Sequence, residues 1–195
     1  MRKRLQTLGL LWIGLAVAQP ATAQWARNFV GITGGATLSD FGAVNSSSRW
    51  GGTAGVSSGF RTSHYTVVNL EVNWVQMGGG DTRLDYIDIP LTVGGVGSAS
   101  GGALRARAYA GISLGFKVGC SATTAFASCD NANSTQWTVP FGIMIGQWTR
   151  PGRFVALDVR YAYSLSDAFT TSRAYNRSWQ FRLLFGKTAG GRRAF

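Results

Sequence analysis

The sequence predicts an all-β protein, an eight-stranded antiparallel up-and-down transmembrane β-barrel of the outer-membrane type. Three observations lead to this fold class. Apolar and polar residues alternate with a period of two along eight segments, which is the pattern of strands whose two faces lie in different environments. The polar positions hold mostly Gly, Ser, Thr and Asn, and the chain has only one Glu and three Lys. A leader typical of exported proteins precedes the first segment.

The alternation defines each strand in turn. In the first four segments, the apolar face is Val30, Ile32, Ala36 and Leu38 in 29–38; Trp50, Ala54, Val56 and Phe60 in 50–60; Val68, Leu70, Val72 and Trp74 in 67–76; and Ile87, Ile89, Leu91 and Val93 in 86–93. In the last four, it is Ala106, Ala108, Ala110, Ile112, Leu114 and Phe116 in 105–116; Trp137, Val139, Phe141, Ile143 and Ile145 in 137–145; Val155, Leu157, Val159, Tyr161, Tyr163 and Leu165 in 155–165; and Trp179, Phe181, Leu183 and Phe185 in 178–185. Their lengths are close to the roughly 9 to 11 residues that a membrane-spanning strand needs.

A soluble barrel is the alternative reading of the same alternation. It would place the apolar face inside and cover its exterior with charge, but one Glu and three Lys cannot cover eight strands. Small polar residues fit the narrow interior of an eight-stranded barrel, and large apolar residues on the opposite face fit lipid. The sheet must then close, because an open edge in hydrocarbon would leave backbone N–H and C=O groups unpaired.

The start of the chain resembles a secretory signal peptide. A basic start at residues 2–4 precedes an apolar run at 8–18, and Ala21-Thr22-Ala23 forms a small-residue cleavage site. We therefore expect cleavage after Ala23 and delivery to the bacterial outer membrane. The predicted organisation is a signal peptide over 1–23, a barrel over 24–187 and a short Gly/Arg-rich tail over 188–195.

The connections alternate between the two ends of such a barrel. With a periplasmic N-terminus, the expected outer loops are 39–48, 78–83, 117–135 and 166–176, and the expected inner turns are 61–64, 95–103 and 148–153. Pro90 and Pro140 fall inside strands and cannot donate to the ladder. Bulges or edge-like geometry are therefore expected at these two prolines.

Cys120 and Cys129 are the only cysteines. In an oxidising compartment, their spacing favours a disulfide. A metal site is disfavoured, because there is no CxxC motif and the only histidine is His64. No cofactor is expected.

Charged residues fall into two groups. Those on the inward face should form ion pairs inside the barrel: Glu71, Asp88, Arg105, Arg107, Asp158, Arg160 and Arg182. Those at the outer strand ends are candidates for contact with lipopolysaccharide phosphates: Arg49, Arg83, Lys117, Arg173 and Arg177. A proton or ion pathway is the alternative role for the first group.

Catalysis and nucleic-acid binding are both disfavoured. His64 is the only candidate for acid–base catalysis. It lies next to Ser63 in an expected inner turn, without an acidic residue nearby in the sequence to orient it. The chain has no basic helix or stacking motif, so no nucleic-acid partner is expected.

Several segments resemble PorT-like outer-membrane β-barrel proteins. Leu84 to Leu91 (LDYIDIPL) is similar to the LDYLEIPL segment of that family, and Gly31 to Ser39 (GITGGATLS) resembles its first strand. Ala110 to Phe116 and Asp158 to Leu165 resemble two later strands. The resemblance implies an outer-membrane barrel, and some members of the family belong to a secretion apparatus. The family's eighth strand ends close to the terminus with an aromatic residue. Here the strand pattern ends at Phe185 and the tail ends at Phe195, so either aromatic could serve as the assembly signal.

These patterns predict a non-enzymatic outer-membrane barrel with a structural or surface-interaction role carried by its extracellular loops. The expected partners are outer-membrane lipid, lipopolysaccharide and, during biogenesis, the barrel assembly machinery, and no protein partner can be named. The alternatives are a component of a secretion or envelope-assembly machine, or a lipid A-modifying enzyme.

Overall fold

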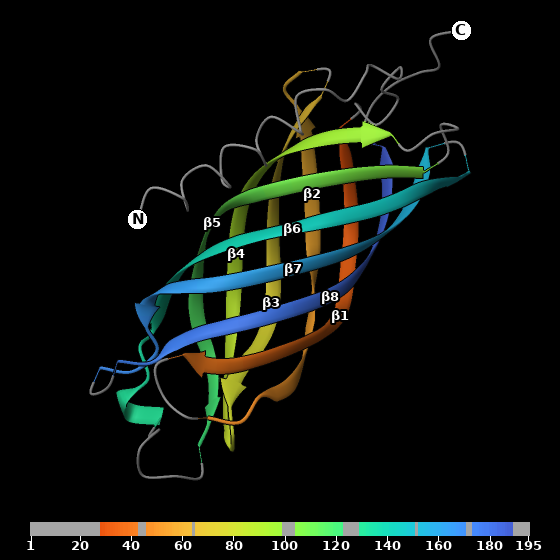
Figure 1. Cartoon of the computed structure of the whole chain (residues 1–195). Coiled ribbons are helices and arrows are strands. Elements are labelled where there is room, and N and C mark those ends of the chain that lie inside the picture. The colour runs from red at the N-terminus through yellow and green to blue at the C-terminus, as the bar shows by residue number, and fades with distance from the viewer. Residues whose placement is uncertain are drawn as a thin grey trace, which may run out of the picture.

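The protein forms a closed β-barrel of eight antiparallel strands in the order β1 to β8 (Figure 1). This computed structural model describes residues 28–42, 46–63, 65–98, 104–122, 129–150, 152–170 and 173–188. The elements are β1 (Phe29–Gly42), β2 (Arg49–Arg61), β3 (Thr66–Gly79), β4 (Thr82–Ser98), β5 (Leu104–Ser121), the short 3₁₀ helix η2 (Cys129–Asn131), β6 (Thr135–Arg150), β7 (Arg153–Asp167) and β8 (Tyr175–Thr188). The predicted signal peptide and residues 189–195 of the tail lie outside the described residues.

The two faces of the strands confirm the prediction from alternation. Large apolar side chains point outward, with Ile32 62% and Trp50 64% exposed. Polar side chains on the opposite face, such as Thr37 and Asn69, are at most 1% exposed. The outside of the barrel is therefore apolar, and its interior is polar over most of its length. Among the described residues, no helix is long and apolar enough to cross a membrane.

The strands are longer than the predicted segments. They run from 13 to 18 residues, beyond the roughly 9 to 11 that span the hydrocarbon. The expected loop at 78–83 is a tight turn centred on Gly80, whose φ of 56° suits a residue without Cβ. β5 likewise continues to Ser121, into the region expected to be a loop. Backbone pairing continues past the segments in which apolar residues alternate, and alternation alone cannot reveal that extension.

The prolines do not produce the expected bulges. The β3–β4 register is the same on both sides of Pro90, and the β5–β6 register is the same on both sides of Pro140. Pro90 remains paired with Ser113 of β5, and Pro140 with Ala162 of β7. Each proline lacks the backbone N–H that would donate to one of its two neighbouring strands. One hydrogen bond of the ladder is therefore absent on that side, but the register of the strands does not change. The register shifts lie elsewhere, for example between Asp85 and Tyr86.

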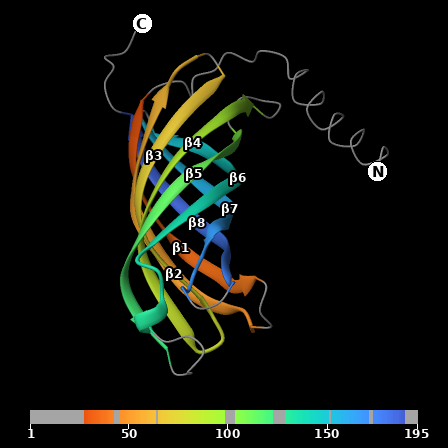
Figure 2. The ribbon, with the colours of Figure 1, turned by 90° about the vertical axis from the view of Figure 1, so that its left-hand side faces the viewer.

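The barrel has two distinct ends, as Figures 1 and 2 show. We call one the terminal end, where β1 begins at Phe29 and β8 finishes at Thr188. We call the other the disulfide end, where β5 finishes at Ser121 and η2 lies. The first and last strands close the barrel along their full length, from Phe29 opposite Thr188 to Gly42 opposite Tyr175.

Apolar residues fill the interior at each end. The terminal plug consists of Phe29, Val67, Tyr109, Met144, Phe154, Ala156 and Leu184. The disulfide plug consists of Phe41, Leu84, Tyr86, Ala132, Ala168, Phe169 and Ala174. Each contains an edge-to-face aromatic pair, Phe29 with Phe154 at 5.1 Å between ring centroids and Phe41 with Phe169 at 5.3 Å. The polar interior therefore lies between two apolar layers.

Candidate functional site

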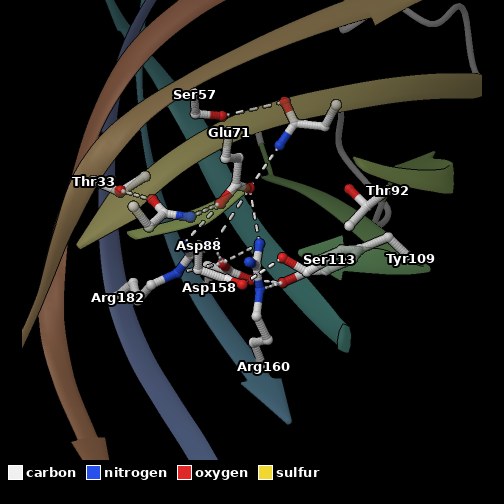
Figure 3. A network of polar contacts seen from close by, with 12 residues as sticks. Thr33, Ser57, Glu71, Asp88, Thr92, Tyr109, Ser113, Asp158, Arg160 and Arg182 are labelled. Carbon is white, nitrogen blue, oxygen red and sulfur yellow. Dashed lines mark hydrogen bonds and ion pairs between the residues drawn. The ribbon is translucent and has the colours of Figure 1, made fainter. Parts of the chain in front are cut away.

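A cluster of four charged side chains occupies the polar interior (Figure 3). Glu71 of β3 forms a 2.8 Å salt bridge with Arg160 of β7 and another with Arg182 of β8. Asp158 of β7 forms an ion pair with Arg182 and lies 3.6 Å from Arg160 Nη2. All four side chains are at most 1% exposed. Two carboxylates thus face two guanidinium groups, and their formal charges cancel.

Neutral polar groups complete the hydrogen bonding of Glu71. Residues at alternate positions of a strand share a face, so Asn69 and Asn73 flank Glu71 on the inside of β3. Asn69 Nδ2 donates to Glu71 Oε1 at 2.7 Å, and Asn73 Nδ2 donates to Oε2 at 2.8 Å. Thr33 and Ser57 in turn donate to the amide oxygens of Asn73 and Asn69, both at 3.2 Å. Each carboxylate oxygen therefore accepts from an amide and a guanidinium, as a buried charge requires.

Tyr109 of β5 connects the cluster to the terminal plug. Its hydroxyl donates to Asp158 Oδ1 and accepts from Arg160 Nε at 3.0 Å. Its ring lies 5.2 Å from the guanidinium carbon of Arg107 and from that of Arg160. The aromatic ring therefore belongs to the apolar layer, while its hydroxyl belongs to the charged one.

The structure brings together four of the seven predicted interior charges and leaves three outside the ion pairs. Asp88 accepts a hydrogen bond from Ser113 Oγ. Arg107 Nη2 donates to the carbonyl oxygen of Val67 at 3.3 Å and to Thr92 Oγ1 at 3.4 Å. Arg105 is buried, and its Nε has no hydrogen-bond partner among the described residues.

The prediction of ion pairs is therefore wrong for Asp88, Arg105 and Arg107, none of which forms a salt bridge in the described part of the chain. For Arg107 the register explains the outcome. Met144 lies opposite Arg107 on one side and opposite Asp158 on the other, so its side chain separates the two charges. Strand alternation predicts which side chains point inward but not which of them meet.

The contacts of this cluster join strands inside the barrel. The four charged side chains are at most 1% exposed and lie in the polar interior between the two apolar plugs. No group of three or more His, Cys, Asp or Glu side chains in the described segments could hold a metal ion. What the cluster does is link β3 to β7 and β8 across the barrel.

The disulfide end carries a braced loop. Cys120 of β5 and Cys129 of η2 form the predicted disulfide, with Cα atoms 5.7 Å apart. Asn133 N donates to the carbonyl oxygen of Ala168 at 2.9 Å, and Thr170 N donates to that of Asn131 at 2.8 Å. The described part of the β5–β6 connection is therefore fastened to the β7–β8 connection.

The five cations predicted to contact lipopolysaccharide all lie on strands or loops at the disulfide end. Arg83 and Arg177 pair with Asp85 and Asp40 at 2.8 Å, and both arginine side chains stay about 40% exposed. Arg49 Nη1 donates to the carbonyl oxygen of Gly80 at 3.4 Å, while Arg173 is exposed. The ammonium of Lys117, unlike the charged groups of the other four, is bound to the backbone of the loop that follows its strand.

Lys117 is a structural lysine and a poor candidate for lipid contact. Its ammonium donates to the carbonyl oxygen of Cys129 at 3.2 Å and to that of Ala132. It thus holds the loop that follows its own strand.

His64, the only residue that the sequence offered as a catalytic candidate, lies outside the described residues.

Sequence reasoning missed the groups that complete the interior. The period-two alternation turns Asn69, Asn73 and Tyr109 inward but assigns them no role. The signal for the two asparagines is that a carboxylate between two inward amides has hydrogen-bond donors on both sides. The plug aromatics Phe41 and Phe169 lie in regions expected to be loops, so no alternation was available to reveal them.

Comparisons with solved structures agree with this fold. Neisserial surface protein A matches with a TM-score of 0.55 and 12% identity over 83% of this chain and 97% of that one. The outer membrane protein OprG from Pseudomonas aeruginosa matches with a TM-score of 0.52 and 11% identity over 84% and 97%. The chain has the fold of small outer-membrane β-barrels. No protein-family model matches it, and no curated protein matches its sequence.

Proposed function

We propose that this protein is an exported, non-enzymatic barrel of the bacterial outer membrane that presents its disulfide end as an extracellular interaction surface. The observation that carries the membrane location is the closed barrel with an apolar exterior. Outward side chains such as Ile32, Ile112 and Ile143 are more than half exposed on different strands, which is costly in water and favourable in lipid.

The filled interior supports a role other than transport. A channel of this fold needs an open polar lumen. Here a cluster of two carboxylates and two guanidinium groups, whose formal charges cancel, lies between two apolar plugs. The same burial keeps Glu71 and Asp158 away from any substrate, and this supports a non-enzymatic role.

The disulfide end supports the interaction role. Loops on a rigid scaffold are where binding surfaces usually lie, and this end joins two connections through Asn133 and Thr170 and fixes one of them with the Cys120–Cys129 bond. It also carries the exposed charges of Arg83, Arg173 and Arg177. A braced, charged surface loses less conformational entropy on binding than a free loop does.

Two measurements test the proposal. Heat-modifiable migration on gels and co-flotation with membranes are expected, and recovery as a soluble periplasmic monomer would overturn the membrane location. Crosslinking on intact cells, followed by affinity isolation, then compares the native protein with a variant in which 122–134 is replaced by a Gly/Ser linker.

A matched variant with the same linker at 62–65, on the terminal end, controls for general damage to the barrel. A crosslinked partner that is lost only with the 122–134 replacement supports the surface role. A partner retained in both variants, or an altered lipid A mass in cells that lack the protein, would contradict it.

A further inference from the structure

Acidic side chains are distributed unequally between the two ends of the barrel. All eight acidic residues of the sequence are among the described residues. Glu71, Asp88 and Asp158 are buried inside the barrel, and the other five lie at the disulfide end: Asp40, Asp81, Asp85, Asp130 and Asp167. The terminal end therefore has no acidic side chain, whereas Arg61, Arg153 and Lys187 all lie there.

Two of these cations lie side by side. Arg153, the first residue of β7, is directly opposite Lys187 of β8, and both side chains are exposed on the outside of the barrel. Like charges at opposite cross-strand positions repel each other. No carboxylate pairs with either residue, since the salt bridges of the described residues involve other arginines. The pair has no counter-ion among the residues that the structure describes.

An apolar groove continues from this pair along the outer wall. The strand register places two rows of outward residues across neighbouring strands. The row at the cation level is Arg153, Lys187, Val30, Ser58 and Leu70, and the next row toward the barrel middle is Val155, Phe185, Ile32, Val56 and Val72. All ten residues line one surface groove of about 750 Å³, within the usual range for ligand sites.

The shape of the groove follows from residue size. Ser58 is a small outward residue between larger neighbours, Val56 and Phe60, on its own strand. Rows two residues apart along a strand are separated by about 6.6 Å. A headgroup bound at the cation row would thus have its hydrocarbon beside Phe185 and Ile32 in the next row.

We propose that this groove binds one anionic phospholipid, with the phosphate held between Arg153 and Lys187 and an acyl chain lying against the apolar row. The inference rests on the proposed membrane location, in which the terminal end faces the periplasm and its rim meets the inner leaflet. Charge complementarity selects this occupant, because an uncompensated Arg–Lys pair at the edge of an apolar surface matches an anion with a hydrocarbon tail.

Binding can be measured by native mass spectrometry on the refolded mature chain in detergent. The probes are dioleoylphosphatidylglycerol and dioleoylphosphatidylcholine, which share acyl chains and differ in net charge. We expect retention of phosphatidylglycerol in preference to phosphatidylcholine, and a loss of its affinity on the order of 30-fold in the R153Q/K187Q double variant. The matched control R49Q/R173Q removes two cations from the disulfide end and should retain the preference.

A second variant tests the apolar half of the site. S58W fills the groove without a change of charge and should weaken phosphatidylglycerol binding at least tenfold. Millimolar inorganic phosphate should not displace the lipid, because it lacks the acyl chain. Displacement by phosphate, or an S58W variant with native affinity, would overturn the lipid assignment.

The membrane location is tested separately by insertion of each variant into phosphatidylcholine vesicles. A protein that inserts but binds both lipids equally, with R153Q/K187Q unchanged, refutes only the lipid site. A protein that does not insert at all refutes both proposals. Capture of a second copy of the chain on this surface instead of lipid would also overturn the lipid site.

Discussion

Glu71 of β3 and Arg182 of β8 are 111 positions apart in the sequence and meet inside the barrel, with Oε2 2.8 Å from Nη1. The contact spans the lumen, since β3 and β8 are not neighbours in the sheet. The wall is held by hydrogen bonds between adjacent strands, whereas this pair links strands across the interior. Its formation depends on the closure of the whole barrel.

Removal of Glu71 should therefore destabilise the barrel strongly. Glu71→Ala leaves Arg160 and Arg182 with Asp158 as their only carboxylate, and breaking a buried ion pair costs about 3 to 5 kcal/mol. The measurement is the free energy of unfolding in urea, followed by tryptophan fluorescence in lipid vesicles. Asp81→Asn, which removes an exposed carboxylate from the β3–β4 turn, is the control and should change this free energy by less than about 0.5 kcal/mol. Equal effects of the two substitutions would refute the central role of the cluster.

The Tyr109 hydroxyl should contribute independently of the ring. Tyr109→Phe removes the donor to Asp158 and the acceptor for Arg160 Nε, and an unsatisfied buried polar group costs about 1 to 3 kcal/mol. The same unfolding measurement applies. Tyr163→Phe removes a hydroxyl from the outer face, where the side chain is 39% exposed, and should be close to neutral. A neutral Tyr109→Phe would show that water replaces the hydroxyl.

A charge on the outer wall should be costly near the middle of a strand. Ile143 lies at the centre of β6 and is 53% exposed. Arginine on the lipid face costs about 2 to 4 kcal/mol at the bilayer midplane and about 0 to 1 near the interface. Ile143→Arg should lower the free energy of unfolding by the first amount, and Ser134→Arg, just before β6, by the second. Similar losses of unfolding free energy at both positions would contradict a bilayer around the middle of the strands.

The disulfide should stabilise the loop more than the barrel. A Cys120→Ser/Cys129→Ser variant removes the bond, but the charged cluster and the strand ladder are independent of it. We expect faster protease cleavage between positions 120 and 129, with unchanged heat-modifiable migration. Wild-type protein under reducing conditions should behave like the variant, and a loss of migration in both would show that the bond is needed for the barrel itself.

The sequence revealed the faces of the strands but not the contacts between them. Alternation placed Glu71 and Arg182 inside because each belongs to a local pattern of period two. Their pairing depends on the stagger of all intervening strands, which no local pattern encodes. Lys117 shows the same limit at the disulfide end, because its role depends on where the following loop returns. Arg107 shows it inside the barrel, where Met144 lies between Arg107 and Asp158 in the strand register.

The β1–β8 pairing has a consequence for how the chain is made. β1 is paired with β8 over all of its 14 residues, so all eight strands must be synthesised before the first strand can pair with the last. Until then, one border of the growing sheet keeps its hydrogen-bonding groups free and needs shelter from the bilayer. A chain truncated before Tyr175 should therefore fail to close into a barrel and be degraded, however well its first seven strands pair.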